Sequence, residues 1–565
     1  MSSDDADQGP RPDDADGPEP PWWPQVAGDL AVVGFLSAGT DPVTGEPVAP
    51  TQYAPDHVLV STLAPVDAAV AVLLDAAAAL GWGLAQDEAF GTVVLDEDPE
   101  DLVERQERLP WATGAPGVVR FVLTVQPGAA PPDAWRLLQA ARARVPAGDD
   151  VLRGVSLDHV LTIGARLAPR PFHSTNPFHS TNPFHSTNPF HSTNPFHSTN
   201  PFGRAAASAV LSYAAPGTGG LQPVAYVGPT PQRHEVVTGR RPVVGVLDTG
   251  CGEHPWLGHV NTLPVPGGAI GRTGPTDDPE RVPDQHERLV GARDAVAGHG
   301  TFIAGLLHQG APDADLLAWR VVGSEGAVLE SDLVKALVAV AGLVVRYYRG
   351  AADGAPLDVL VLPVGYYCET VADALFGRTM YEVLASMGRR GTVVVCSAGN
   401  DATERPLYPA AFAPWDQARM APGDVDPVGR RARDAVPVVS VGALNPNGTD
   451  ALFGNSGCWV STYAPGAAVV STMPRGFSGS AEPEARVRVG GRTRESVDPD
   501  DFTGGFAVWS GTSFSAPVLA ATVAHRLLGR LRDDDGVRGR TAAVARARRA
   551  LTQRPALLRP GPALP

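Results

Sequence analysis

The stretch Ser510-Gly511-Thr512-Ser513-Phe514-Ser515-Ala516-Pro517, followed by the apolar run 518–528, decides the fold. Small residues and Gly511 allow a tight turn, Pro517 suits a first helical turn, and the apolar run predicts a buried helix. Ser513 is therefore expected at a helix start, where unpaired backbone N–H groups and the helix dipole stabilise an oxyanion. A serine that only caps the helix is the alternative interpretation.

Two other stretches supply chemically matching partners. The run 241–247 has the composition of a short buried strand, and Asp248 follows it, which places a carboxylate at the carboxyl end of a parallel strand. His299 lies between Gly298 and Gly300, directly before a second expected helix at 301–309. The chain thus holds a nucleophile, a base and a carboxylate that orients the base.

Four blocks make the chain resemble the subtilases, the subtilisin-like serine peptidases. They are Asp-Thr-Gly at 248–250, His-Gly-Thr at 299–301, Ser-Ala-Gly-Asn at 397–400 and Gly-Thr-Ser-Phe-Ser-Ala-Pro at 511–517. The order Asp, His, Ser along the chain is that of subtilisin. The resemblance covers about half of the chain, and it implies an α/β fold with a mostly parallel, doubly wound sheet.

The resemblance also implies a role for each residue. Ser513 attacks the scissile carbonyl of a protein or peptide substrate, His299 takes and returns the proton, and Asp248 orients the imidazole. The side-chain amide of Asn400 and the backbone N–H of Ser513 bind the oxyanion. The implied substrate-binding residues are Val364, Gly365, Ala398, Gly399 and Gly326. No metal ligand is named and no cofactor is required, although the family leaves an unlocated structural calcium ion open.

Several alternatives stay open at this point. His254 and His308 are rival bases, and Asn400 could be a simple turn residue. An aspartic peptidase would need a second Asp-Thr-Gly, which the sequence lacks, so that only a dimer could supply it. The alternative function is a catalytically idle peptide-binding or regulatory module on the same scaffold.

The chain before the peptidase-like part divides by composition. Residues 1–25 are acidic and predicted to be disordered. Residues 26–168 predict a β-α-β-β-α-β order, with strands at 57–61, 91–95, 118–125 and 155–163 and helices at 66–80 and 132–145, which indicates a ferredoxin-like α+β domain. Subtilase propeptides have this topology and position. The resemblance therefore implies a zymogen whose N-terminal domain is an intramolecular inhibitor, with an unrelated interaction domain as the alternative.

The linker 169–240 contains five copies of Pro-Phe-His-Ser-Thr-Asn. Its prolines exclude a helix, and it is the expected place of self-cleavage. The peptidase-like domain is expected at 241–535, with strands at 243–247, 314–322, 359–363, 392–396 and 438–441. Its helices are expected at 301–309, 330–349, 371–387 and 514–531, and a closing helix and tail at 536–565.

Charge and targeting signals limit the partners. A net charge of −16 argues against a nucleic-acid surface, and no apolar run is long enough to predict a membrane span. Because no secretory signal is recognisable, the predicted location is cytoplasmic, with secretion by an unconventional route as the alternative. The four cysteines show no metal-binding spacing and are expected as buried thiols, or as two disulfides in an exported protein.

Overall fold

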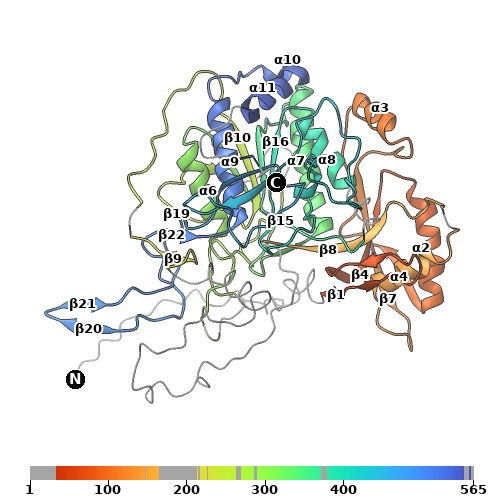
Figure 1. Cartoon of the computed structure of the whole chain (residues 1–565), viewed down its shortest axis with the longest axis horizontal. Coiled ribbons are helices and arrows are strands. Elements are labelled where there is room, and N and C mark those ends of the chain that lie inside the picture. Colours follow the sequence, from red (N-terminus) through yellow and green to blue (C-terminus); the bar gives the residue numbers. More distant parts are fainter. Residues whose placement is uncertain are drawn as a thin grey trace, which may run out of the picture.

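The computed structural model describes residues 33–146, 148–163, 213, 217–225, 227–261, 269–285, 289, 291–370, 378–552 and 559–560. The acidic segment 1–25 and the repeats of the linker lie outside the described residues. Two units are visible, a large one built around a central sheet and a smaller N-terminal one, drawn in orange and red, that packs against its side (Figure 1).

The large unit contains an eight-stranded sheet whose order is β11-β12-β10-β14-β16-β17-β18-β23. Neighbours from β11 to β18 are parallel, and only β23 at the edge is antiparallel. The strands are β11 (Val260–Asn261), β12 (Asp315–Arg320), β10 (Val243–Asp248), β14 (Val359–Leu362), β16 (Val393–Ser397), β17 (Val439–Leu444), β18 (Thr462–Pro465) and β23 (Arg559–Pro560).

Helices cover both faces of this sheet, because its strands are apolar on both faces. In β14, Val359 and Val361 face the core beneath α6 (His299–Gly310), α9 (Thr512–Leu527) and α11 (Arg540–Thr552). The alternate residues Leu360 and Leu362 face the core beneath α7 (Glu330–Tyr348) and α8 (Arg378–Gly388). The predicted doubly wound α/β fold is confirmed.

The predicted elements of this unit agree with the structure within a few residues. The first part of the helix expected at 371–387 lies outside the described residues, and its described part is α8. The helix expected to reach residue 531 ends at Leu527, and Gly529 follows with a φ of 74° in the left-handed region that favours glycine.

The N-terminal unit has the ferredoxin-like order. Its four main strands, β4 (Thr51–Ser61), β5 (Trp82–Gln86), β7 (Gly117–Val125) and β8 (Val155–Ile163), form an antiparallel sheet in the order β8-β4-β7-β5. Two helices, α2 (Val66–Leu80) and α4 (Ala134–Arg142), share one core with it. A further helix, α3 (Pro99–Arg108), follows the short strand β6 (Thr92–Val94).

The second strand of the β-α-β-β-α-β order was predicted at 91–95, and this position was wrong. The second strand is β5, which starts directly after Gly81, a residue in the left-handed conformation (φ 75°) that ends α2. Its Trp-Gly-Leu-Ala-Gln sequence lacks the β-branched residues that signal a strand, whereas Thr92–Val94 has them and forms only a three-residue strand beside it on β7.

The two units share a hydrophobic core and buried ion pairs. Leu59, Phe90, Val118 and Leu161 of the N-terminal unit belong to the same core cluster as α7 and α8. Glu382 in α8 is buried and accepts two hydrogen bonds from Arg108, at 3.0 and 2.8 Å. Because a buried carboxylate is costly without its partner, this pair ties the N-terminal unit to one place on the large unit.

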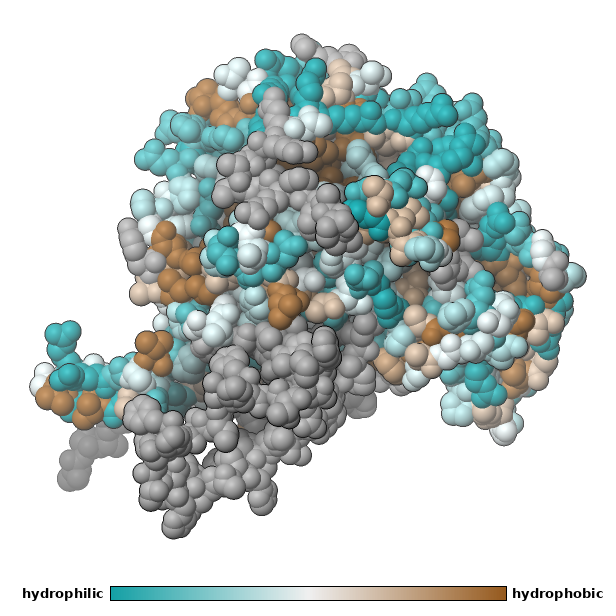
Figure 2. Space-filling view, viewed as in Figure 1, coloured by the Kyte–Doolittle hydropathy of each residue, from teal (hydrophilic) through white to brown (hydrophobic). Residues whose placement is uncertain are grey.

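Surface insertions lie outside this framework. A small antiparallel sheet contains β9 (Gln222–Pro223), β19 (Val469–Thr472) and β22 (Phe506–Trp509). The hairpin of β20 (Arg486–Val489) and β21 (Arg492–Glu495) projects from the body with both hydrophilic and hydrophobic side chains exposed (Figures 1 and 2). Within the described ranges, no helix combines the length and apolar character that crossing a membrane requires.

Candidate active site

Asp248 and His299 meet where a strand ends and a helix begins. Asp248 is the last residue of β10, and His299 is the first residue of α6. The imidazole Nδ1 lies 2.8 Å from Asp248 Oδ1 and 2.9 Å from Oδ2, and both side chains are buried. A Cβ on Gly300 would lie only 2.1 Å from the carbonyl oxygen of Gly250, so glycine is needed for this close approach of helix and strand.

Ser513 lies in the first turn of α9, and the residue after it contacts the imidazole. The ring of the next residue, Phe514, is 5.2 Å from that of His299 between centroids, and the ring of Trp509 is 5.6 Å away. The Ser513 hydroxyl donates to the carbonyl oxygen of Pro363 at 3.4 Å. The predicted nucleophile, base and carboxylate therefore gather at the carboxyl ends of β10 and β14, where an open α/β sheet binds its ligands.

Asn400 is held by the same helix start. Its Oδ1 accepts hydrogen bonds from the backbone N–H and the hydroxyl of Thr512, both at 2.9 Å. These two hydrogen bonds fix the orientation of the amide group. Its oxygen accepts, and its nitrogen Nδ2, near Gly511, is the donor. The arrangement fits a donor to an oxyanion formed on a carbonyl beside Ser513 better than a simple turn residue.

Three of the predicted substrate-binding residues contact the chain's own N-terminal unit. Strand β8 lies between β13 (Ala327–Leu329) and β15 (Val364–Gly365) and is antiparallel to both. Ile163 is opposite Val364, and Thr162 is opposite Gly365. The Ile163 N–H donates to the carbonyl oxygen of Gly326 at 3.0 Å. The structure therefore places Gly326, Val364 and Gly365 along one extended strand, as a peptide substrate would require.

The other two predicted substrate-binding residues follow the neighbouring strand. Ala398 and Gly399 come directly after β16, and the Gly399 N–H donates to the Thr512 hydroxyl at 3.0 Å. Both residues are buried. The hydrogen bond places Gly399 next to the start of α9, where Ser513 follows Thr512.

The rival histidines lie elsewhere. Burial lowers the pKa of His254 and of His308 to about 4, so both are neutral near pH 7. Their rings pack around Trp256, at 6.0 and 6.3 Å between centroids. His308 is nine residues after His299 in α6, which separates the two by about 13 Å along the axis. Neither position suits a base for Ser513.

The cysteines take no part in disulfides. All four are free thiols, and Cys396 and Cys458 are buried. Burial raises the pKa of the Cys251 thiol, with the charge of Glu280 adding to the effect. The thiol three residues after Asp248 is therefore kept protonated and unreactive.

Glu280 is a site residue that the sequence did not reveal. Its Oε1 accepts from the Thr249 hydroxyl and, at 2.8 Å, from the Gly300 N–H, and its Oε2 accepts from the Thr301 hydroxyl. Thr249 also lies 2.8 Å from Asp248 Oδ1. One carboxyl group thus clamps the Asp-Thr-Gly and His-Gly-Thr motifs together. A lone glutamate in a long insertion carries no periodic signal that could have identified it.

Burial, with a smaller effect of the Asp248 charge, raises the pKa of Glu280 to about 7 in spite of the hydrogen bonds from Thr249, Thr301 and Gly300, which lower it. The carboxyl is therefore largely neutral in mildly acidic solution. A protonated Oε1 can donate to Thr249, whose own proton then points to Asp248. In this arrangement Thr249 donates a hydrogen bond to the Asp248 carboxylate and stabilises its charged form.

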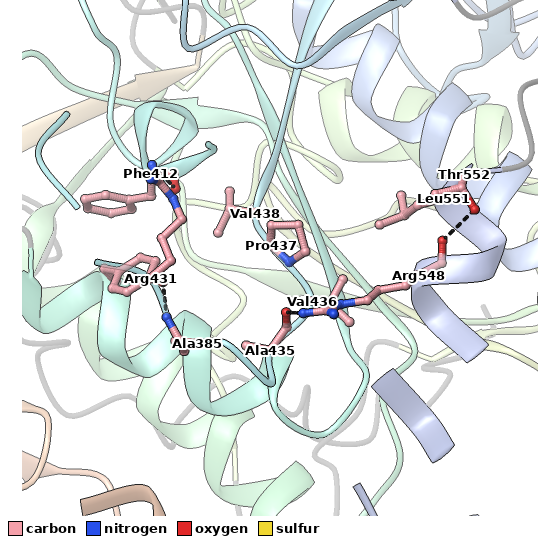
Figure 3. Close-up of a pocket in the computed structure, with 12 residues that line it drawn as sticks. Ala385, Phe412, Arg431, Ala435, Val436, Pro437, Val438, Arg548, Leu551 and Thr552 are labelled. Atoms are coloured by element: carbon pink, nitrogen blue, oxygen red, sulfur yellow. Dashed lines mark hydrogen bonds between the residues drawn. The ribbon is translucent and has the colours of Figure 1, made fainter. Parts of the chain in front are cut away.

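An apolar cavity of about 420 Å³ lies apart from this site (Figure 3). Pro437 and Val438 in its wall precede the first residue of β17, whereas Asp248 is the last residue of β10 and Asn400 comes after the end of β16. The lining residues are Tyr381, Ala385, Phe412, Arg431, Ala432, Ala435, Val436, Pro437, Val438, Arg548, Leu551 and Thr552. None of the predicted catalytic or substrate-binding residues is among them.

Replacing Glu280 by glutamine tests the clamp. Because the carboxyl has a raised pKa in the folded chain, its neutral form contributes stability below about pH 4.5 that is lost as the pH rises through 7. The test uses a Ser513→Ala background, which prevents self-digestion. Between pH 5 and pH 8 the chain with Glu280 should lose about 3 kcal/mol of unfolding free energy that the E280Q chain keeps. Urea unfolding at both pH values measures it.

The exposed Glu253 provides the matched control, since E253Q should leave the pH dependence of unfolding unchanged. If the unfolding free energy changed with pH in the same way for E280Q and for the chain that retains Glu280, the Glu280 carboxyl would not have the raised pKa that its burial requires.

Known proteins match the same part of the chain. A family model described as the Subtilase family matches residues 239–533. The "Thermophilic serine proteinase" of Bacillus sp. (strain AK1) is 26% identical over 196 residues, which are 35% of this chain and 37% of that protein. The "Intracellular serine protease" of Paenibacillus polymyxa is 27% identical over 262 residues, 43% and 63% of the two chains.

"Subtilisin BL" of Lederbergia lenta is 26% identical over 247 residues, which are 42% of this chain and 68% of that protein. The chain thus spans between about a third and two thirds of the length of these three relatives. The family match takes in more than half of the 565 residues and contains all four motifs of the site. The chain belongs to the subtilase family.

Proposed function

We propose that the chain is a serine endopeptidase that hydrolyses peptide bonds through an acyl-enzyme. The observation that carries the proposal is the contact of His299 Nδ1 with both oxygens of Asp248, with the imidazole packed against Phe514, the residue after Ser513 in α9. A carboxylate bound to Nδ1 fixes the tautomer in which the other ring nitrogen, Nε2, accepts a proton. The proposed chemistry needs no cofactor.

The reaction would take place in two halves. Ser513 Oγ attacks the carbonyl carbon while His299 takes its proton, and Asp248 stabilises the imidazolium. The oxyanion accepts from Asn400 Nδ2 and from the Ser513 N–H at the helix start. His299 then protonates the leaving amine, and a water molecule repeats the attack on the acyl-enzyme.

The N-terminal unit would hold this site closed. Strand β8 takes up the backbone hydrogen bonds of β13 and β15, which a substrate strand would need. A substrate strand in this register would have its next residue, the one that follows the Ile163 position, opposite Pro363, whose carbonyl oxygen accepts from Ser513. In the sequence that residue is Gly164. Self-cleavage is therefore proposed at the bond between Gly164 and Ala165, slightly before the linker 169–240.

A buried histidine would make this inhibition sensitive to pH. His159 of β8 lies between two carboxylates of the large unit, with Nδ1 2.7 Å from Glu330 and Nε2 2.7 Å from Glu369. Tyr366 donates to the other oxygen of Glu330 at 2.8 Å. Burial opposes a charged imidazole, but the two carboxylates outweigh it and raise the pKa of His159 well above 6.5.

The neighbouring Asp158 acts in the same direction. It accepts from the N–H and the hydroxyl of Ser331, at 3.0 and 2.7 Å. Burial raises its pKa to about 7 in spite of these hydrogen bonds. The docked N-terminal unit therefore holds protons that the released unit gives up near neutral pH.

Fluorophosphonate labelling tests the proposed activity. After purification, the wild-type chain should shorten by self-cleavage and its Ser513 should take up the label, whereas Ser513→Ala should stay full length and unlabelled. In Asn400→Ala, Ser513 should still take up the label, but kcat should fall about 100- to 1,000-fold. This is the magnitude known for one oxyanion donor in subtilisin. Intact mass and a peptide assay provide the measurements.

Absence of labelling, even after the linker has been cut by an added protease and the N-terminal unit separated, would contradict the proposal. It would favour the idle peptide-binding module instead.

The pH dependence of docking tests the inhibitor role. Free His159 loses its proton above about pH 6.5 while docked His159 keeps it, so docking takes up a proton and weakens as the pH rises, by up to about tenfold per pH unit. In a Ser513→Ala chain cut in the linker, dissociation of the N-terminal unit should therefore increase from pH 6.5 to 9. Size-exclusion chromatography at a series of concentrations measures it.

Glu369→Gln removes one of the two charges that hold the proton on His159. The dissociation of the N-terminal unit should therefore depend less steeply on pH in this variant. Glu484→Gln, at an exposed position, is the control and should keep the slope. An unchanged slope in E369Q would exclude His159 as the titrating group.

A further inference from the structure

The crevice beside Ser513 has two walls that come from neighbouring strands. Strands β14 and β16 pair in parallel, with Leu362 opposite Cys396. The chain leaves the sheet through Pro363, Val364 and Gly365 on one side and through Ala398, Gly399 and Asn400 on the other. The first wall contacts the nucleophile through the Pro363 carbonyl, and the second contacts Thr512. The space between the two walls therefore lies next to the reacting hydroxyl.

The register of β8 identifies the substrate residue that would face this crevice. A substrate strand in the place of β8 has successive residues opposite Gly365, Val364 and Pro363. The carbonyl of the last of these residues is the one beside Ser513, so it belongs to the acyl side of the bond that is cut. The side chain of that residue has the two walls on either side of it.

Leu407 already fills the space between the walls. A Cβ on Gly365 would lie 2.7 Å from Leu407 Cδ2 and Cγ, and a Cβ on Gly399 would lie 2.9 Å from the same Cδ2. One isobutyl group thus packs against both glycines, with only 2% of its surface exposed. Even a single added methyl group would collide with it from either wall.

The backbone around Leu407 keeps it in this position. The next residue, Tyr408, exchanges two hydrogen bonds of 2.9 Å with Tyr366, which follows the first wall. The Leu407 carbonyl accepts from the Ala411 N–H at 2.7 Å. On the other side of Gly399, the Asn455 amide donates to the Ala398 carbonyl at 2.9 Å, which holds the second wall against Leu407.

We propose that Leu407 closes the floor of this crevice and restricts the residue on the acyl side of the cleaved bond to glycine or alanine. The proposal rests on the proposed peptidase function and names its substrate class. The sequence supports it independently, because the residues that follow Ile163 in the chain are Gly164 and Ala165. A larger side chain would have to displace a packed leucine, which a close-packed interior resists.

The test uses the full chain after its own maturation and a series of peptide anilides. The peptides share the sequence Leu-Thr-Ile-X, taken from residues 161–163, with X as Gly, Ala, Val, Leu or Phe before the anilide. Active sites are first counted with a fluorophosphonate. For the wild type, kcat/KM for Gly and Ala should exceed that for Leu and Phe at least 100-fold.

Leu407→Ala should raise the ratio of kcat/KM for the Leu and Phe peptides to kcat/KM for the Gly peptide at least tenfold. Leu407→Val should raise kcat/KM for the Leu and Phe peptides relative to the Gly peptide by a smaller factor. It keeps the test valid where the alanine variant fails to fold. Leu384→Ala, in the buried part of α8, is the control and should leave the ratio unchanged.

The outcomes separate the two proposals. No labelled Ser513 means that the proposed function itself fails. A labelled enzyme that cleaves the Leu or Phe peptide as fast as the Gly peptide overturns the inference, and so does an unchanged ratio in both Leu407 variants.

Discussion

The pairing of β8 with β13 and β15 is the constraint on which the arrangement of the two units depends. It uses backbone groups on both sides of one strand, so it fixes the register of the N-terminal unit against the large one to a single residue. A slip by one position would move His159 away from Glu330 and Glu369, and these two buried carboxylates would lose the imidazole that lies between them. Backbone pairing and side-chain charge therefore specify the same register.

That register relates the rest of the molecule to the candidate site. It places Ile163 opposite Val364, next to Pro363, whose carbonyl oxygen accepts from Ser513. Leu407 packs against Gly365 of the same segment and against Gly399. At the other side of the site, Glu280 clamps Thr249 and Gly300 so that Asp248 and His299 keep their contact. The candidate site is thus rigid on the side of the base and open to a strand on the side of the substrate.

The sequence predicted the features that local motifs carry. Asp248 lies at a strand end and His299 and Ser513 lie at helix starts, as expected, because glycines and apolar runs next to them have a direct structural meaning. The roles of these residues and of Asn400 stay predictions. The α/β fold and the β-α-β-β-α-β order followed from the same patterns. The cytoplasmic location stays a prediction from the sequence.

Long-range packing could not be predicted in this way. Strand β5 carries no β-branched residues and was missed, because its pairing with β7 rather than its own composition makes it a strand. Glu280 and Leu407 belong to loops, and their importance arises only when distant segments meet around them. The alignment of His159 with two carboxylates, 171 and 210 residues away, has no local signal either.

Amide hydrogen exchange at β13 and β15 tests the central claim most directly. In the intact Ser513→Ala chain, residues 326–329 and 364–365 should exchange slowly, because β8 takes up their backbone groups. After the linker is cut and the N-terminal unit is removed at high pH, the same amides should exchange much faster, while those of β10 and β14 remain protected. Fast exchange of β13 and β15 in the intact chain would contradict the account.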